Sequence, residues 1–486
     1  MVLMLKTPEE YKESLREMRP NVYKFGELIE DVTTHSATRR TVEGHAQIYG
    51  LQQDSEYQEL VTTDSILTGE RVSRYLSIVK SPEDMIANSK MKRFMFNVTG
   101  TCTGGRCGGW NGINALWKTT FDMDQKKDTD YHERFKEWLK GAQERDVTIS
   151  VALTDPKGDR TLPPSKQEDP DMNLRIIEEK EDGIVVKGAK IMICGIAAAN
   201  EVLVLPGSKY GEEDKDWAVA FAIPRDIDGL KCVETRHPSD LRELEEGFDI
   251  PVEKGGITQS YLLFEDVFVP RERIFMLKDY EFTLDAVMNF IAPYRAAIGA
   301  CVAGQGDLMV GASILMAWAN GLSEKVFRDK LTQMAINNET TYGIGIAAAA
   351  LGKKHPSGSW QVDTLLSNVN KVYVATLPYE TKRLAQEIGG GIAETGCMPS
   401  FKDFESEEYG ELVQKYLKAV APAESRVRIA RLIEWLTLGA GVPGCMHGGG
   451  SPDGAKLIIQ RTAGFDRCVK LAEELSGMEK DSIKKP

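Results

Sequence analysis

Cysteine is the residue type whose spacing in this chain could support metal or redox chemistry. The 486-residue chain has eight cysteines, and Cys102 and Cys107 form the only close pair, with four residues between them. Some iron–sulfur proteins use this C-x4-C spacing. The cysteines are too sparse for a disulfide scaffold, so the alternative is that most of them are buried free thiols.

A second group of reactive side chains lies between residues 294 and 305. Tyr294, Cys301 and Gln305 are spaced so that they share one helical face, which either lines a pocket or packs in the core. Arg295 stands in an apolar helix start, where an arginine usually pairs with a carboxylate, a phosphate or a cofactor. His447 is a candidate general base, with a hydrogen-bonded structural histidine as the alternative.

Two segments of the chain are rich in glycine, as phosphate-binding loops are. Residues 103–109, TGGRCGG, are not a P-loop, because the Lys–Ser/Thr ending is missing. Gly389, Gly390 and Gly391 would let the backbone approach a phosphate closely. Their alternative role is to end a helix or to form a loop.

The elements that must position these residues fall into three segments. Residues 1–143 carry apolar residues at helical spacing and predict a helical domain. Residues 144–277 contain short runs rich in β-branched residues, separated by turns such as DPKGD and EDG, and predict a β domain. Helical spacing returns in residues 278–486. This order predicts an α+β protein with segregated layers and no Rossmann domain.

Composition excludes several classes of partner. Asp and Glu outnumber Lys and Arg by 73 to 60, giving a net charge of −13. Such a surface repels nucleic acid and anionic membranes, so an anionic substrate needs a local basic pocket. No stretch approaches the roughly 20 apolar residues of a membrane span, and the N-terminus does not resemble a signal peptide. We therefore expect a cytoplasmic protein.

Several long motifs resemble one flavoprotein superfamily, that of 4-hydroxyphenylacetate 3-hydroxylase and 4-hydroxybutyryl-CoA dehydratase (vinylacetyl-CoA isomerase). They are YKFGELIED at residues 23–31, the run Thr154–Lys190, FEDVFVPRERIF (Phe264–Phe275) and MHGGGSP (Met446–Pro452). The similarity extends from about residue 8 to 475, with the motifs in matching order, and is nearer to the dehydratase branch.

The resemblance implies an acyl-CoA-dehydrogenase-like fold, with a middle β-barrel-like domain and a C-terminal helical bundle. It also implies FAD between these two domains, in a homotetramer whose subunits share each flavin site. An isoalloxazine ring needs an apolar slot with donors at its edge. The candidate cofactor-binding residues are Thr154, Asp155, Lys157, Arg160, Lys190, Cys194, Gly389, Gly390 and Gly391. DPKGD alone could be only a β-turn. Cys194 stands where the family often has Thr, so a weak thiol donor replaces a hydroxyl.

The dehydratase branch also implies a [4Fe-4S] cluster held by three Cys and one His. Here Cys107 and Cys301 match two ligands, but Thr103 stands in the place of the first, and Tyr294 in the place of the His. Cys102 could reach the site only through a shifted loop. We therefore expect no intact cluster, and Cys102, Cys107 and Cys301 are weak metal candidates only.

Further polar groups of the dehydratase site are also replaced. Gln259 and Gly444 stand where the branch has Glu, and Val302 stands where it has Lys. These replacements remove most of the side chains that could donate or accept a proton in the reaction. The catalytic candidates that remain are Tyr294, Arg295 and His447.

The hydroxylase branch binds its phenol with an Arg–Tyr pair and a His further along the chain. Here Arg106 and Trp110 are present, but the Tyr is not. His132 follows in DYHERF, where it could also be a surface helix residue. Phenol hydroxylation therefore has weak support.

Three hypotheses follow. The first is a flavin enzyme without a cluster that isomerises, dehydrates or oxidises an acyl-CoA or a related acid derivative. The second is a reduced-flavin aromatic monooxygenase, which needs oxygen and a separate flavin reductase. The third is a non-catalytic flavoprotein scaffold. In the first two, the ligand is a small molecule.

Overall fold

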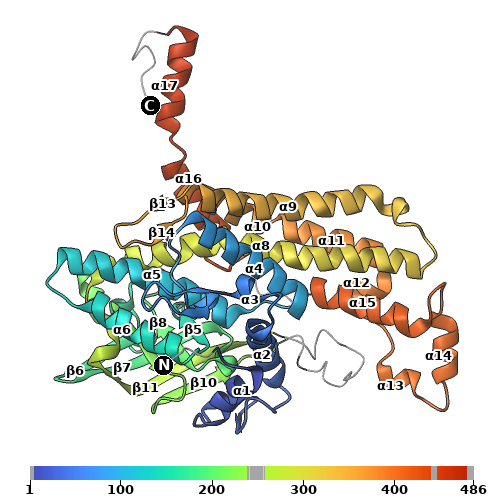
Figure 1. Cartoon of the computed structure of the whole chain (residues 1–486), viewed down its shortest axis with the longest axis horizontal. Coiled ribbons are helices and arrows are strands. Elements are labelled where there is room, and N and C mark those ends of the chain that lie inside the picture. Colours follow the sequence, from blue (N-terminus) through green and yellow to red (C-terminus); the bar gives the residue numbers. More distant parts are fainter. Residues whose placement is uncertain (1–4, 238–239, 241–255, 257, 439–445, 479–486) are drawn as a thin grey trace.

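The chain folds into helices, then two β-sheets, then helices again, as the sequence predicts (Figure 1). A computed structural model describes residues 5–237, 240, 256, 258–438 and 446–478. The helices of the N-terminal part are α1 (Pro8–Arg16), α2 (Arg39–Gln53), α3 (Gln58–Val61), α4 (Pro82–Thr99), α5 (Gly104–Lys126) and α6 (Tyr131–Glu144). A short 3-10 turn, η1 (Arg74–Leu76), precedes α4.

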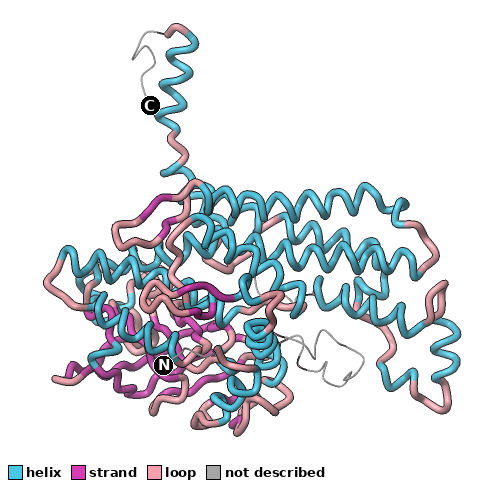
Figure 2. Tube along the Cα trace, in the orientation of Figure 1, coloured by secondary structure: helices cyan, strands magenta, loops and turns pink. Residues whose placement is uncertain are grey.

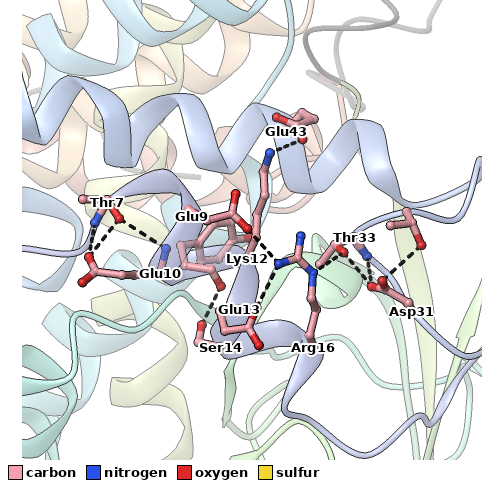
Figure 3. A network of polar contacts seen from close by, with 12 residues as sticks. Thr7, Glu9, Glu10, Lys12, Glu13, Ser14, Arg16, Asp31, Thr33 and Glu43 are labelled. Atoms are coloured by element: carbon pink, nitrogen blue, oxygen red, sulfur yellow. Dashed lines mark hydrogen bonds and ion pairs between the residues drawn. The ribbon is translucent and has the colours of Figure 1, made fainter.

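Helix α1 shows how local sequence starts an element and tertiary packing keeps it in place. Thr7 and Glu10 form a capping box, in which the Thr7 hydroxyl accepts the Glu10 N–H and the Glu10 carboxylate accepts the Thr7 N–H. Arg16 pairs with carboxylates of the same helix on the exposed side (Figure 3). Tyr11 and Leu15 are buried on the other side. The Tyr11 hydroxyl donates to the Ala198 carbonyl at 2.7 Å, which ties α1 to the β domain.

Two sheets form the middle of the molecule. The six-stranded sheet has the order β2 (Glu27–Ile29), β1 (Val22–Lys24), β10 (Leu230–Glu234), β11 (Gln259–Pro270), β7 (Gly183–Cys194) and β6 (Arg175–Lys180). The four-stranded sheet has the order β12 (Ile274–Leu277), β9 (Val219–Pro224), β8 (Glu201–Val204) and β5 (Ile149–Ala152). Val186 and Phe264 from the first sheet share one core with Val204 and Phe221 from the second.

The N-terminal segment also contributes strands, which helical periodicity alone did not predict. Val22 pairs in parallel register with Cys232, so β1 and β2 extend the six-stranded sheet. The partner of β1 is β10, which lies more than 200 residues away in sequence. Both β1 and β2 have only three residues. Such short strands carry little local pattern, so only the long-range pairing defines them. A separate hairpin joins β3 (Thr62–Asp64) to β4 (Arg71–Ser73).

The glycine-rich segment 103–109 is the start of α5, and its glycines serve packing. A Cβ on Gly109 would lie 2.2 Å from the Ile149 carbonyl oxygen, and one on Gly112 would lie 2.9 Å from Leu203. A Cβ on Gly105 would lie 3.2 Å from the carbonyl oxygen of Gly195, which directly follows Cys194. The absence of side chains therefore lets α5 lie directly on β5 and brings residues 102–107 to the end of β7.

The C-terminal part is a helical bundle around α8 (Thr283–Ala319). Its other helices are α9 (Arg328–Ala350), α10 (Thr364–Val374), α11 (Leu377–Gly389), α12 (Gly391–Thr395), α13 (Phe401–Phe404), α14 (Gly410–Leu417), α15 (Ala423–Thr437), α16 (Pro452–Thr462) and α17 (Phe465–Ser476). Figure 2 shows the long helices of this bundle lying side by side. A small hairpin, β13 (Lys353–Lys354) and β14 (Trp360–Gln361), joins α9 to α10.

The expectation that no stretch approaches a membrane span was wrong for one helix among the described residues: α8 is long and apolar enough to cross a membrane by length and composition. More than half of its most apolar stretch is buried inside the protein, where it packs against α4, α5, α9, α10, α11 and α15. Its apolar character is therefore explained by its place at the centre of the bundle. Pro293 interrupts the helix hydrogen bonding just before Tyr294 and Arg295.

Candidate functional site

The structure gathers four thiols around Tyr294. Cys102 lies just before α5 and Cys107 lies in its first turn, Cys301 lies two turns after Tyr294 on α8, and Cys194 ends β7. All four thiols are close enough to affect the ionisation of the Tyr294 phenol. The predicted metal candidates are thus neighbours, and Cys194, predicted as a flavin contact, belongs to the same cluster. We call these five residues the thiol–tyrosine cluster.

The cluster is a set of neutral weak acids. Burial, followed by the neighbouring thiols, holds the pKa of Tyr294 well above its ordinary value. Burial likewise raises the pKa of the Cys194 thiol to about 11. At neutral pH both groups keep their protons, so they can donate hydrogen bonds but cannot remove a proton.

Tyr75 and Gln259 extend the cluster. Burial, reinforced by Cys107, raises the pKa of Tyr75, and its hydroxyl lies 3.0 Å from the Thr103 hydroxyl. The Gln259 amide donates to the Cys194 sulfur at 3.6 Å. The amide that replaces the family's Glu therefore contacts the thiol that replaces the family's Thr.

The metal-binding capacity of the cluster can be judged from its groups. Among the described residues, no group of three or more His, Cys, Asp or Glu side chains has an arrangement that could hold a metal ion. A phenol binds a metal only after it loses its proton, whereas the family's His offers a neutral nitrogen lone pair. Tyr294 therefore does not fit the His position of the family's ligand set.

The glycine loop before α16 lies against Tyr294 and Arg295. Gly449 and Gly450 have φ angles of 69° and 86°, in the left-handed region. A Cβ on Gly449 would lie 2.7 Å from the Tyr294 ring, and one on Gly450 would lie 3.0 Å from Arg295 Nη2. These contacts bring the MHGGGSP motif to the thiol–tyrosine cluster, although the two segments are about 150 residues apart in sequence.

Arg295 holds this loop without a carboxylate partner among the described residues. Its Nε donates to the Gly449 carbonyl at 2.9 Å, and its Nη1 donates to Asn368 on α10. Lys371, also on α10, donates to the Gly448 carbonyl at 2.6 Å. Burial lowers the pKa of Arg295 to about 10, so it remains a cation at neutral pH. Its Nη2 makes no hydrogen bond to a described residue and stays available to an anion.

His447 lies at the outer side of this loop. The residue is exposed, and its carbonyl accepts the Gly450 N–H at 2.9 Å. No described residue hydrogen-bonds to its imidazole, so the structure gives no support to a hydrogen-bonded structural histidine. The role of general base stays a prediction.

The segment Thr154–Asp155 lies beside strand β7. The Thr154 carbonyl accepts the Ile191 N–H at 2.9 Å. Asp155 is buried, forms an ion pair with Lys190 at 2.6 Å and accepts the Tyr210 hydroxyl at 2.8 Å. Lys190 also donates to the carbonyls of Leu153 and Leu205. Lys190 thus donates two hydrogen bonds to carbonyls and its charge is paired with Asp155, which favours a positioning role over contact with a phosphate.

The other predicted cofactor residues occupy different surroundings. Lys157 and Arg160 are exposed on the loop after Asp155. Gly389 is buried at the end of α11, whereas Gly390 and Gly391 are exposed and face open space. The described structure does not bring Gly389–Gly391 into contact with the thiol–tyrosine cluster.

Several residues that the sequence suggested for a pocket or for substrate binding lie in the core or away from the thiol–tyrosine cluster. Gln305 is fully buried and donates to the Leu436 carbonyl, so it packs inside the bundle. Arg106 is buried over the rings of Tyr49 and Tyr75. Trp110 is buried with Lys92 over its ring. His132 is buried rather than a surface residue. Gly444 lies outside the described residues.

Sequence reasoning missed Asn368, Lys371, Tyr75 and Tyr210. A run of polar residues in the otherwise apolar helix 364–374 could have indicated the first two, because Asn and Lys are rarely buried without a partner. No local pattern distinguishes the two tyrosines.

The family is shown by models that match nearly the whole chain. The model described as 4-hydroxyphenylacetate 3-hydroxylase N terminal matches residues 7–276, and the corresponding C-terminal model matches residues 284–477. A 4-hydroxybutyryl-CoA dehydratase/vinylacetyl-CoA-Delta-isomerase from Clostridium aminobutyricum is 40% identical, over 98% of this chain and all of the relative. A 4-hydroxyphenylacetate 3-monooxygenase oxygenase component from Thermus thermophilus is 27% identical, over 90% of this chain and 89% of the relative.

Solved structures agree on the fold. An oxygen-tolerant 4-hydroxybutyryl-CoA dehydratase from N. maritimus has a TM-score of 0.95 at 37% identity, covering 99% of this chain and 97% of its own. The oxygenase component (HpaB) of 4-hydroxyphenylacetate 3-monooxygenase complexed with FAD has a TM-score of 0.83 at 24% identity, covering 97% of this chain and 99% of its own. A glutaryl-coenzyme A dehydrogenase has a TM-score of 0.50 at 15% identity, covering 85% of this chain and 84% of its own, and shares only the fold. The chain is therefore an enzyme of the 4-hydroxyphenylacetate 3-hydroxylase and 4-hydroxybutyryl-CoA dehydratase family, with an acyl-CoA-dehydrogenase-like fold.

Proposed function

We propose that this protein is an FAD-dependent enzyme that acts on an acyl-CoA or a related acid derivative, without an intact [4Fe-4S] cluster. The observation that carries this proposal is the thiol–tyrosine cluster, in which a protonated Tyr294 stands where the dehydratase branch has a metal-binding His. The 40% identity to a dehydratase/isomerase supports the acyl-CoA substrate class.

The residues present fit a flavin better than a metal cluster. Arg295 offers its free Nη2 beside Gly450, just before the N-terminus of α16, where backbone donors favour a phosphate. Cys194 and the backbone near Thr154 offer donors for the edge of the ring system. When bound, FAD would supply electron-accepting chemistry.

The chain's own groups then bind and polarise the substrate. Tyr294 and Cys194 are neutral donors in a buried site, so they can stabilise negative charge that develops on a thioester carbonyl. Neither can act as the base at neutral pH. We assign proton removal to His447, which the glycine loop carries at the edge of the cluster.

Anaerobic purification with added FAD tests this proposal. We expect a yellow protein with less than one iron per chain, whose flavin spectrum changes on addition of butyryl-CoA but not of butyrate. Four irons per chain would contradict the absence of the cluster, and a colourless protein that takes up no FAD would contradict the flavin.

A reduced-flavin aromatic monooxygenase is the second candidate, because relatives of that kind cover nine-tenths of the chain. It predicts rapid oxygen consumption when a phenol is added to the chemically reduced flavoprotein. A scaffold without catalysis predicts neither the butyryl-CoA response nor the oxygen consumption.

A further inference from the structure

A pocket lies among the N-terminal helices, away from the thiol–tyrosine cluster. Its volume is about 630 Å³, which lies within the range of small-molecule sites. Residues of α5, α6, the β3–β4 loop and the tip of the β13–β14 hairpin form its walls. Phe121 in this pocket follows Cys107 by 14 residues on α5, a separation of about 21 Å along the helix. A ligand here would not reach the reacting groups.

Apolar and aromatic side chains form the body of the pocket. Trp117 and Phe121 meet the ring of His132 edge-on, with ring centroids 4.8 and 5.6 Å apart. The Trp117 indole N–H donates to the Ser357 carbonyl at 3.1 Å, which fixes its ring against the hairpin. Ile66 and Leu67 supply further apolar surface. A planar aromatic molecule fits such walls, because aromatic rings favour edge-on and offset contacts.

His132 places one unpaired hydrogen-bond acceptor in these walls. The Thr120 hydroxyl donates its one proton to the Leu116 carbonyl at 2.7 Å. The same hydroxyl lies 3.0 Å from His132 Nδ1, and with its proton already donated it can only accept a hydrogen bond there. Nδ1 therefore carries the imidazole proton. Because burial keeps this imidazole neutral at pH 7, Nε2 is a bare acceptor. The residue is 9% exposed, and no described residue bonds to Nε2.

The rim of the pocket carries more negative than positive charge. Asp124 accepts the backbone N–H groups of Tyr131 and His132, and thereby anchors the start of α6. Glu133 pairs with Lys136 one turn later. The charges of Asp124, Glu133 and Lys136 sum to one net negative charge at the rim, which disfavours an anionic ligand.

We propose that this pocket binds a planar aromatic molecule that donates one hydrogen bond to His132 Nε2 and carries no negative charge, such as an indole. The ring fills the space between Trp117, Phe121 and Leu67, and its N–H donates to Nε2. The site does not depend on the flavin or on the proposed reaction.

Ligand pairs test the hydrogen bond on the unaltered full-length protein. Isothermal titration should show one saturable site for indole, and about tenfold weaker binding of benzofuran, which has the same shape but leaves Nε2 unpaired. Tryptamine should bind more tightly than indole-3-acetate because of the rim charge. Equal affinities for indole and benzofuran would overturn the proposal.

Variants locate the site. H132F keeps an aromatic ring but removes the acceptor, and should abolish the preference for indole over benzofuran. L67W should fill the pocket and block both ligands. The matched control is H35F, which replaces an exposed histidine on another segment and should leave both affinities unchanged. If correctly folded H132F kept the preference, His132 would not be the acceptor and the proposal would be wrong.

Discussion

At the scale of single residues, Tyr294 decides which chemistry the site can support. Its ring contacts Gly449, its hydroxyl lies among four thiols, and its raised pKa keeps it protonated. A histidine at this position would offer a neutral nitrogen lone pair to a metal. A single change of side-chain type therefore separates a metal ligand from a hydrogen-bond donor.

Restoring the two missing ligands tests this interpretation. We expect the double variant Y294H/T103C to gain iron and visible absorbance after anaerobic reconstitution with iron and sulfide, because four ligand positions would then be filled. The unaltered protein should retain less than one iron per chain. Y294F/T103S changes the same positions without adding ligands and should behave like the unaltered protein. Equal iron in all three proteins would show that other groups decide cluster assembly.

Gly449 is the second residue on which the site depends. G449A would place a methyl group 2.7 Å from the Tyr294 ring at a φ of 69°, so we expect FAD affinity to fall at least tenfold as the loop moves away from Arg295. The matched control is G391A, since a Cβ on Gly391 meets open space. Fluorescence titration with FAD compares the two. Equal loss in both variants would point to the Gly389–Gly391 loop as a further flavin contact.

At the scale of elements, strand β7 carries a strained bulge beside the cluster. The pairing of β7 with β11 shifts register between Ser260 and Leu262, opposite Met192. Met192 has a φ of 57° and is 47% exposed, although its strand neighbours Ile191 and Ile193 are less exposed. Bulges re-aim side chains near functional sites, and strain of this kind persists where function requires it.

Substitutions at Met192 measure that strain. Both M192A and M192G remove the side chain, but only glycine adopts a positive φ without steric cost. We expect M192G to exceed M192A in free energy of unfolding by about 0.5–1 kcal/mol in urea titrations of the apoprotein. If the side chain also contacts the flavin, FAD should bind both variants more weakly than the unaltered protein. A less stable M192G would show that the backbone is not strained there.

At the scale of the whole molecule, buried neutral histidines make the fold sensitive to acid. Burial lowers the pKa of His45, His132 and His237 to about 4. Between pH 6.5 and 4 these imidazoles are neutral in the folded chain and protonated in the unfolded chain. The unfolded chain therefore binds more protons, and falling pH favours unfolding across this window.

His45 is the most buried of the three, and its replacement tests the effect. The unaltered protein should lose on the order of 3 kcal/mol of stability through this residue between pH 7 and 4. H45Q cannot be protonated, so its free energy of unfolding should depend less on pH. H35Q, at an exposed position, is the control. Identical pH profiles for H45Q and the unaltered protein would assign the acid sensitivity to other groups.

Helix α17 extends from the body of the molecule and has no buried residue (Figure 1). Phe465, Val469 and Leu475 lie on one side of it and are more than half exposed. A 12-residue helix is marginal in water without packing, so we expect this face to pack against another subunit of the homotetramer that the family resemblance implies.

Truncation after Gly464 tests the role of α17. The melting temperature of the dissociated chain should stay unchanged, because no buried side chain is removed. Light scattering should show a smaller assembly than for the full chain. An unchanged assembly mass would contradict the role of α17 in subunit contacts.

The sequence by itself determined the order of helices and strands and the family. Local periodicity is enough to predict α1, α4, α6, α8 and α15, and the strands β5, β7, β8, β9 and β11. The family resemblance further implies that Tyr294 and Thr103 stand at the positions of two metal ligands. The order of helices and strands rests on residue types and spacing, which need no tertiary information.

Only the tertiary structure decided which of these residues meet. It placed Cys194 beside Cys102, Cys107 and Cys301, although these four positions span 200 residues of sequence. The fold also pairs Lys190 with Asp155. It packs the glycines of segment 103–112 against β5, so they form the contact surface of α5 with that strand. Close packing of distant segments sets these contacts, and no local pattern records which segments will touch.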